Sequence, residues 1–141
     1  MAPGKPLTNR QRRRIARAVH DAERWTGLQF CVYLGPTEAD PLAHARALMD
    51  DLHLTERPAV LLLVAPASRR LEIVTSPDAA ARIPDSVARL AAVAMSASFG
   101  VGDIAGGIAE GVRLLAQAAG AGTGAPGGAD LPDLLDATAP V

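Results

Sequence analysis

Five arginines near the start of the chain form its densest run of one charge. Guanidinium groups bind phosphate through paired hydrogen bonds, so this cluster could contact RNA, DNA or an acidic protein. The interpretation that the sequence favours is the solvated face of a helix, because Ile15, Val19 and Trp25 form an apolar stripe on the opposite side. No aromatic side chains lie beside the cluster, so sequence-specific nucleic-acid recognition is not expected. The arginines are Arg10, Arg12, Arg13, Arg14 and Arg17.

The thiol and imidazole groups are spaced too widely to indicate catalysis. Cys31 is the chain's one cysteine and lies in a strand-like run without a neighbouring histidine, which predicts a buried, inert thiol. His20, His44 and His53 do not form a pair with the spacing of zinc or iron ligands. His44 follows Asp40 by four residues and could hydrogen-bond to it.

A glycine-rich segment, FGVGDIAGG at residues 99–107, allows two interpretations. Glycines can line a phosphate-binding loop, but such a loop follows a strand and ends in Lys-Ser or Lys-Thr, and neither condition holds here. Small residues also allow a helix to pack closely against its neighbours. We therefore expect this segment to serve packing.

The elements that must position these residues can be read from helix-start signals and apolar runs. Asp40-Pro41, Pro84 and Asp103 predict helix starts, and Thr8 or Asn9 can cap an earlier helix that Gly27 ends. Three runs predict strands, and the middle one is apolar at every position, as a strand buried on both faces requires. The strands are expected at residues 28–34, 59–65 and 71–75.

This order of elements predicts an α/β fold. The first two strands are joined through a helix and should be parallel, whereas the third returns antiparallel to the second. Helices on both faces then give a small three-layer, Rossmann-like sandwich with a mixed sheet of three to four strands. We expect a disordered tail at 1–7, one domain at 8–119 and a flexible tail at 120–141. Within the second tail, LPDLLD at 131–136 could dock as a short amphipathic helix.

Composition excludes several classes of protein. The chain has 141 residues, 49% of them hydrophobic and only 3% aromatic, which fits one aliphatic core. Its formal net charge of −1 provides no general attraction to nucleic acid or anionic membrane. The N-terminal stretch lacks the apolar region of a secretory signal, and no apolar run is long enough to span a bilayer. A cytoplasmic location is therefore expected.

Three stretches, at residues 14–34, 56–85 and 99–115, resemble the TPM domain family, named after thylakoid-lumen and repair proteins. The first resembles the family's opening helix, threonine-glycine turn and strand in RIARAVHDAERWTGLQFCVYL. The second, ERPAVLLLVAPASRRLEIVTSPDAAARIPD, resembles its central strand and hairpin, and the third, FGVGDIAGGIAEGVRLL, its closing helix. Within the family, the sequence is most similar to a soluble actinobacterial branch without an assigned function.

The resemblance implies a small Rossmann-like sandwich and, in some members, acid phosphatase activity or calcium binding in an acidic cleft. The family's cleft uses one aspartate before the central strand and a second before the third helix. Asp85 matches the second position, but Arg57-Pro58-Ala59 replaces the motif that carries the first. Ser76-Pro77-Asp78 likewise replaces a glycine-tyrosine-glycine motif. These departures count against metal binding and phosphatase chemistry.

The topology places Arg57, Asp78 and Asp85 at one edge of the sheet, because the third strand ends where the second begins. Asp85 follows Pro84 at a helix start, where the helix dipole stabilises a carboxylate without any ligand. A guanidinium beside these carboxylates favours a structural ion pair between Arg57 and Asp85 over a calcium site.

Three functions remain open. The first is a non-catalytic cytoplasmic domain that acts through contacts with an unknown protein partner. The second is a degenerate phosphatase that holds calcium or magnesium through Asp78 and Asp85. The third is a weak polyanion binder that uses the N-terminal arginines. No cofactor, membrane span or nucleic-acid partner is expected under the first hypothesis.

Overall fold

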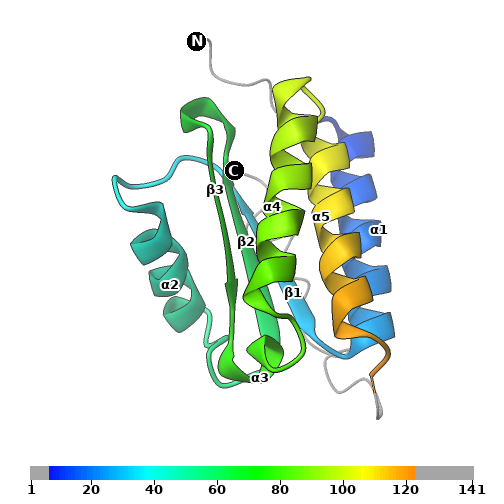
Figure 1. Cartoon of the computed structure of the whole chain (residues 1–141). Coiled ribbons are helices and arrows are strands. Elements are labelled where there is room, and N and C mark those ends of the chain that lie inside the picture. The colour runs from blue at the N-terminus through cyan, green and yellow to red at the C-terminus, as the bar shows by residue number, and fades with distance from the viewer. Residues whose placement is uncertain (1–6, 123–141) are drawn as a thin grey trace.

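The computed structural model describes residues 7–122, so residues 1–6 of the tail predicted at 1–7, most of the tail predicted at 120–141 and the LPDLLD segment lie outside the described residues. Helices and strands alternate and then give way to helices alone, as Figure 1 shows. In chain order the elements are α1 (Asn9–Thr26), β1 (Gln29–Leu34), α2 (Pro41–Asp51), β2 (Ala59–Ala65), the 3₁₀ turn η1 (Pro66–Ser68), β3 (Arg70–Thr75), α3 (Pro77–Ala80), α4 (Asp85–Gly100) and α5 (Ile104–Ala119).

The sheet has three strands in the order β1-β2-β3. β1 pairs parallel with β2, in a register that aligns Gln29 with Ala59. β3 pairs antiparallel with β2 and aligns Thr75 with Val60. All seven residues of β2 are buried, because this central strand has a neighbour on each side and helices over both faces. The predicted α/β fold, its mixed sheet and its strand directions are confirmed.

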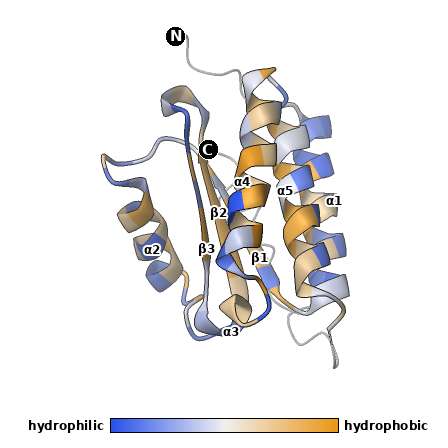
Figure 2. Cartoon of the chain, viewed as in Figure 1, coloured by the Kyte–Doolittle hydropathy of each residue, from blue (hydrophilic) through white to orange (hydrophobic). Residues whose placement is uncertain are grey.

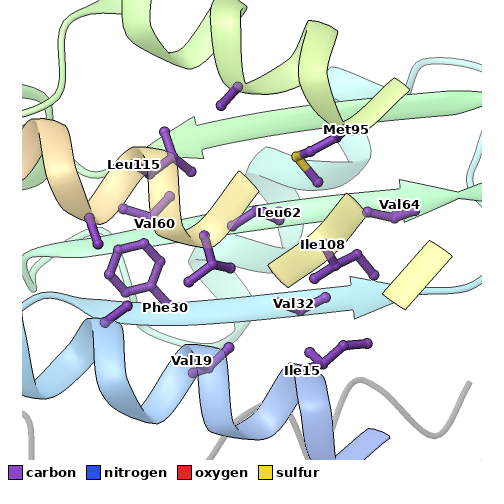
Figure 3. Packing of buried hydrophobic residues seen from close by; sticks show 14 of the residues in the cluster. Ile15, Val19, Phe30, Val32, Val60, Leu62, Val64, Met95, Ile108 and Leu115 are labelled. Carbon is purple, nitrogen blue, oxygen red and sulfur yellow. The ribbon is translucent and has the colours of Figure 1, made fainter. Parts of the chain in front are cut away.

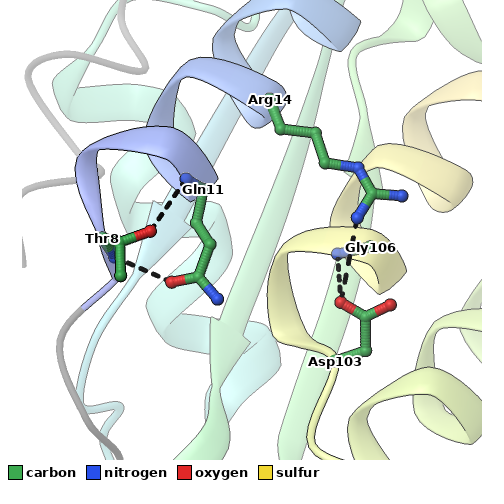
Figure 4. Close-up of polar contacts among 5 residues, drawn as sticks. All are labelled: Thr8, Gln11, Arg14, Asp103 and Gly106. Atoms are coloured by element: carbon green, nitrogen blue, oxygen red, sulfur yellow. Dashed lines mark hydrogen bonds and ion pairs between the residues drawn. The ribbon is translucent and has the colours of Figure 1, made fainter.

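Side-chain caps determine where the helices begin. Thr8 and Gln11 form a reciprocal capping box at the start of α1 (Figure 4). Asp40 and Asp103 each accept a backbone N–H in the first turn of α2 and α5. Gly27 ends α1 with a φ of 77°, a left-handed conformation that glycine adopts without strain. These caps satisfy helix-end donors that would otherwise lack partners.

Two apolar clusters cover the two faces of the sheet. The larger cluster packs α1, α4 and α5 against one face, where Phe30, Val32 and Leu62 alternate with residues that face the other side (Figure 3). The smaller cluster packs α2 against the opposite face, through Ala45 and Met49. The molecule is therefore a three-layer sandwich with unequal outer layers.

Three details differ from the expectations. Trp25 does not join the buried stripe of α1, because 56% of its surface is exposed. The short helix α3 was not predicted, although Ser76 followed by Pro77 is a cap with proline at the first helical position. The first residues of the predicted flexible tail are held by hydrogen bonds, since the Gly122 N–H donates to the Trp25 carbonyl at 2.8 Å.

Across residues 7–122, no helix is both long enough and apolar enough to cross a lipid bilayer.

Candidate functional site

The start of β2 and the end of β3 meet at one edge of the sheet, as the topology predicts. The Ser76 N–H donates to the Ala59 carbonyl at 2.9 Å, and the Ala59 N–H donates to the Ser76 hydroxyl at 2.9 Å. The same hydroxyl accepts the Ala79 N–H at 3.3 Å and so caps α3. Ser76 is buried, and its hydroxyl joins a strand start to a helix start. Sequence reasoning treated this serine only as part of a turn.

The predicted ion pair between Arg57 and Asp85 does not form. Arg57 is half-buried in the turn before β2, whereas Asp78 and Asp85 are exposed in the first turns of α3 and α4. No ion pair within 4.0 Å involves any of the three in the described part of the chain. Each aspartate lies at its own helix N-terminus, where the helix dipole stabilises it, so neither requires the guanidinium.

The residues present do not fit the calcium site that the TPM resemblance implies. Calcium takes six to eight oxygen ligands, so several carboxylates or carbonyls must converge on it. Between residues 7 and 122, no group of three His, Cys, Asp or Glu side chains is placed to hold a metal ion. We therefore derive no chemistry through a metal at this edge.

The five arginines lie along α1. Arg10, Arg13, Arg14 and Arg17 are exposed and recur at three- and four-residue steps, which places them on one side of the helix. Arg14 approaches α5, where its guanidinium lies 4.0 Å from the Asp103 carboxylate that caps the helix (Figure 4). The predicted solvated face and the predicted basic patch are thus the same surface.

A cavity of about 420 Å³ lies between α1 and α5. Small side chains such as Ala18 and Ala22 line it, and acidic and basic groups both border it. The ion pair of Glu110 and Arg113, whose charged groups lie 2.6 Å apart, borders the cavity. The hydrogen bond from Arg113 lowers the pKa of Glu110. Because both signs of charge are present, this cavity does not select a polyanion.

The histidine and cysteine predictions have different outcomes. Cys31 is buried, as predicted. The side chain of His44 does not bond to Asp40, and its Nδ1 instead lies 2.9 Å from the hydroxyl of Thr37. The ring of His44 also meets the ring of Tyr33 edge-on, with centroids 5.2 Å apart. The Asp40 carboxylate caps α2, and the His44 side chain instead contacts Thr37 in the loop before that helix.

The glycine-rich segment serves packing, as expected. A Cβ atom at Gly107 would overlap the ring of Phe99, and one at Gly111, just after the segment, would overlap the side chain of Met95. These glycines therefore allow α5 to approach α4 closely.

The outer edge of the sheet at β3 is a feature that the sequence analysis did not consider. The backbone bond from the Ser76 N–H to the Ala59 carbonyl places these two residues at a hydrogen-bonded position of the ladder, and in an antiparallel ladder such positions alternate with ones whose backbone groups point outward. Leu71, Ile73 and Thr75 therefore direct their backbone N–H and C=O groups away from β2. In the described part of the chain no strand lies on that side of β3.

Helix α4 lies beside this open edge and carries apolar side chains into solvent. Leu90 and Val93 are 68% and 67% exposed, and orange bands mark this helix in Figure 2. A hollow of about 380 Å³ lies between the start of β3 and the same helix. Its lining comes from Arg69, Arg70, Leu71, Ala92, Val93 and Ser96. We call the β3 edge together with Leu90 and Val93 the β3–α4 surface.

Two solved structures have a similar fold. One is the BA42 protein from the psychrophilic bacterium Bizionia argentinensis, with a TM-score of 0.74 and 22% identity over 81% of both chains. The other is the N-terminal domain of a protein from P. gingivalis, with a TM-score of 0.68 and 22% identity over 79% of this chain and 75% of that one. At this level of identity the likeness concerns the fold alone.

Comparison of the sequence with known families and proteins places the chain in a family. The uncharacterized proteins Rv2468c and MT2543 of two Mycobacterium tuberculosis strains, H37Rv and CDC 1551, are each 31% identical to it over 88 residues. Those residues make up 62% of this chain and 52% of each relative, so the chain spans about half the length of the curated relatives it matches. The pattern of one family matches residues 2–116, and the chain belongs to that family, described as Domain of unknown function (DUF5130).

Proposed function

We propose that this chain is a non-catalytic cytoplasmic domain that binds a protein partner by pairing a strand of that partner with β3. The observation that carries the proposal is the open edge of β3 beside the exposed Leu90 and Val93. Strand addition of this kind obtains affinity from backbone hydrogen bonds and specificity from the side chains that flank the edge.

The energetics favour an occupied edge. Folded proteins usually protect an exposed edge strand with charged side chains, proline or a bulge; β3, with the sequence RLEIVT, carries charge only at Arg70 and Glu72 and contains no proline. Each net hydrogen bond contributes about 0.5–1.5 kcal/mol. Burial of the exposed two thirds of Leu90 or Val93 would contribute about 1–2 kcal/mol each.

The thiol and the two carboxylates that could do chemistry lie on separate elements, which supports a non-catalytic role. Cys31 is buried, and Asp78 and Asp85 lie at two different helix starts. We expect no turnover of an aryl phosphate with or without calcium or magnesium. Metal-dependent turnover that Asp78→Asn or Asp85→Asn abolishes would instead support the phosphatase alternative.

The binding proposal is tested by affinity capture from the native cell with matched variants. Val93→Glu places a charge on the β3–α4 surface, and Thr75→Pro removes one outward N–H without removing a β2–β3 hydrogen bond. His20→Glu, on the exposed side of α1, is the control. We expect the proteins captured by the natural chain to be lost with the first two variants and kept with the control. Identical capture by all four chains would contradict the proposal.

Weak polyanion binding is a second candidate, favoured by the exposed arginines along one side of α1. A chain that binds phosphates in this way should elute from a heparin column at a salt concentration that falls when Arg10, Arg13 and Arg17 are replaced by glutamine. No retention of the natural chain at low salt would eliminate this candidate.

We also infer that the DUF5130 family is related to the TPM domain family. The stretches at 14–34, 56–85 and 99–115 support this relationship, because they follow the TPM order of helix, strand, hairpin and closing helix. A comparison of many sequences from both families tests it. Failure of the threonine-glycine turn and the central strand to align across members would contradict it.

A further inference from the structure

We propose that the strand that pairs with β3 is β3 of a second copy of this chain. This inference rests on the proposed function and specifies its partner. The two copies would be related by a twofold axis at the middle of β3, and their sheets would join into one continuous sheet.

The pattern of outward-pointing backbone groups suits such a pairing. Leu71, Ile73 and Thr75 are symmetric about Ile73, so an antiparallel pairing aligns Ile73 with Ile73 and Leu71 with Thr75 of the second copy. Residues that exchange hydrogen bonds are then opposite one another along the whole strand. All three outward N–H groups and all three outward carbonyls of each copy find partners in this register.

The charges at the two ends of β3 favour a second copy of this chain as the partner, in the antiparallel orientation. The strand begins next to two exposed cations, Arg69 and Arg70, and the chain just beyond its end carries the exposed anion Asp78. None of these three residues forms an ion pair with another described residue. Antiparallel pairing places Arg70 opposite Ser76 of the second copy, two residues from its Asp78. Arg70 of each copy thus approaches Asp78 of the other, whereas a parallel pairing would bring the Arg70 side chains of the two copies together.

The exposed side chains of α4 fit the same arrangement. This helix lies over the face of the sheet at the β3 edge, and its Val93 lines the hollow beside Leu71. A twofold axis through the edge brings the α4 helices of the two copies to the same side of the joined sheet. Leu90 and Val93 of each copy would then be covered by the other, which accounts for two of the most exposed large apolar side chains in the described residues.

The test is sedimentation velocity of the full chain over a wide concentration range, with single and mixed charge variants. Arg70→Glu alone and Asp78→Arg alone each place like charges at both ends of the interface, so each should raise the dimer dissociation constant about tenfold. Mixed in equal amounts, the two variants can form a heterodimer in which both ends are again complementary. We expect the mixture to dimerise about as tightly as the natural chain.

Two further variants and one further measurement complete the design. Val93→Glu should also weaken the dimer, while the control His20→Glu on α1 should leave it unchanged. Amide exchange of Leu71, Ile73 and Thr75 should slow as the protein concentration rises. Thermal melting of each variant at a concentration where the natural chain is monomeric verifies that it folds.

The outcomes separate this inference from the proposed function. If the natural chain stays monomeric at millimolar concentration, the proposal that the partner is a second copy is wrong. If Val93→Glu nevertheless abolishes the capture of other proteins, the proposal that a partner strand pairs with β3 still stands. A dimer that His20→Glu disrupts, or that the mixed charge variants fail to restore, overturns the antiparallel β3 interface. Concentration-independent exchange at the three β3 amides would also overturn it.

Discussion

Arg82 ties together parts of the chain that lie far apart in sequence. Its guanidinium donates to the Thr26 carbonyl at 2.8 Å and to the Gly120 carbonyl at 2.8 Å, with two further bonds to the Ala119 carbonyl. These acceptors lie at the C-terminal ends of α1 and α5, where helix carbonyls lack partners within the helix and the dipole favours a cation. No motif identifies this role in the sequence, because the acceptors are backbone atoms 38 and 56 residues away.

We expect Arg82→Ala to lower the free energy of unfolding by about 1.5–3 kcal/mol, the range for hydrogen bonds from a charged donor. Arg82→Lys should recover only part of the loss, because an ammonium group lacks the spread donor fork with which the guanidinium reaches several carbonyls at once. Arg89→Ala, at an exposed position of α4, is the matched control and should change stability by less than about 0.5 kcal/mol. Urea denaturation measures all three. Equal stability of the Arg82→Ala and Arg89→Ala variants would contradict the role.

Tyr33 is the chain's one tyrosine, so its titration can be followed by absorbance. Burial and, to a lesser extent, the negative charge of Glu38 raise the pKa of Tyr33 above its ordinary value of 10.0. The folded state therefore keeps a proton that the unfolded state loses, and stability falls as pH rises through the folded-state pKa. We expect a midpoint above 10.0 in the folded chain and no such loss of stability in Tyr33→Phe. A midpoint at or below 10.0 would contradict the effect of burial.

At the scale of the element, α5 depends on glycine for its position. Gly111 is buried, and a Cβ there would overlap the side chain of Met95, which is itself enclosed. Gly100 also lies in a helix, but nothing lies within 4 Å of a Cβ placed there. The same substitution should therefore have opposite effects at the two glycines.

We expect Gly111→Ala to destabilise the fold by about 1–3 kcal/mol, because the added methyl group overpacks the contact between α4 and α5. Gly100→Ala should stabilise it by about 0.5–1 kcal/mol, because alanine loses less conformational freedom in a helix. Thermal and urea unfolding of both variants provide the comparison. A gain in stability at Gly111 would show that Met95 moves aside without cost.

The elements themselves were largely predictable, because their signals are local. The apolar run of β2 indicated a central strand, and Asp40 and Asp103 indicated helix starts that the structure confirms. Contacts between side chains of different elements were harder to predict from the sequence. The expected ion pair of Arg57 was wrong because a shared sheet edge does not bring side chains within bonding distance. The orphan amide of Gln29, buried without a hydrogen-bond partner among the described residues, has no sequence signal either.

At the scale of the whole molecule, the two outer layers of the sandwich differ in how firmly they are attached. Eight residues of α5 are buried, five of them in the larger cluster, whereas α2 buries Pro41, Ala45 and Met49 alone on the other face. α5 also packs against both α1 and α4, while α2 has no helix beside it in the described chain. Unequal burial of this kind produces units that open with different free energies.

We therefore predict that α2 opens without the rest of the fold. In native-state hydrogen exchange, amides of β2 should exchange most slowly, those of α5 close to them, and those of α2 distinctly faster. Met49→Ala should accelerate exchange mainly in α2, because the side chain belongs to the smaller cluster. Leu62→Ala should accelerate exchange throughout, because this fully buried side chain lies in the larger cluster and its loss costs about 2–5 kcal/mol. Exchange of α2 and α5 at one common rate in both variants would instead show that the layers unfold as a single unit.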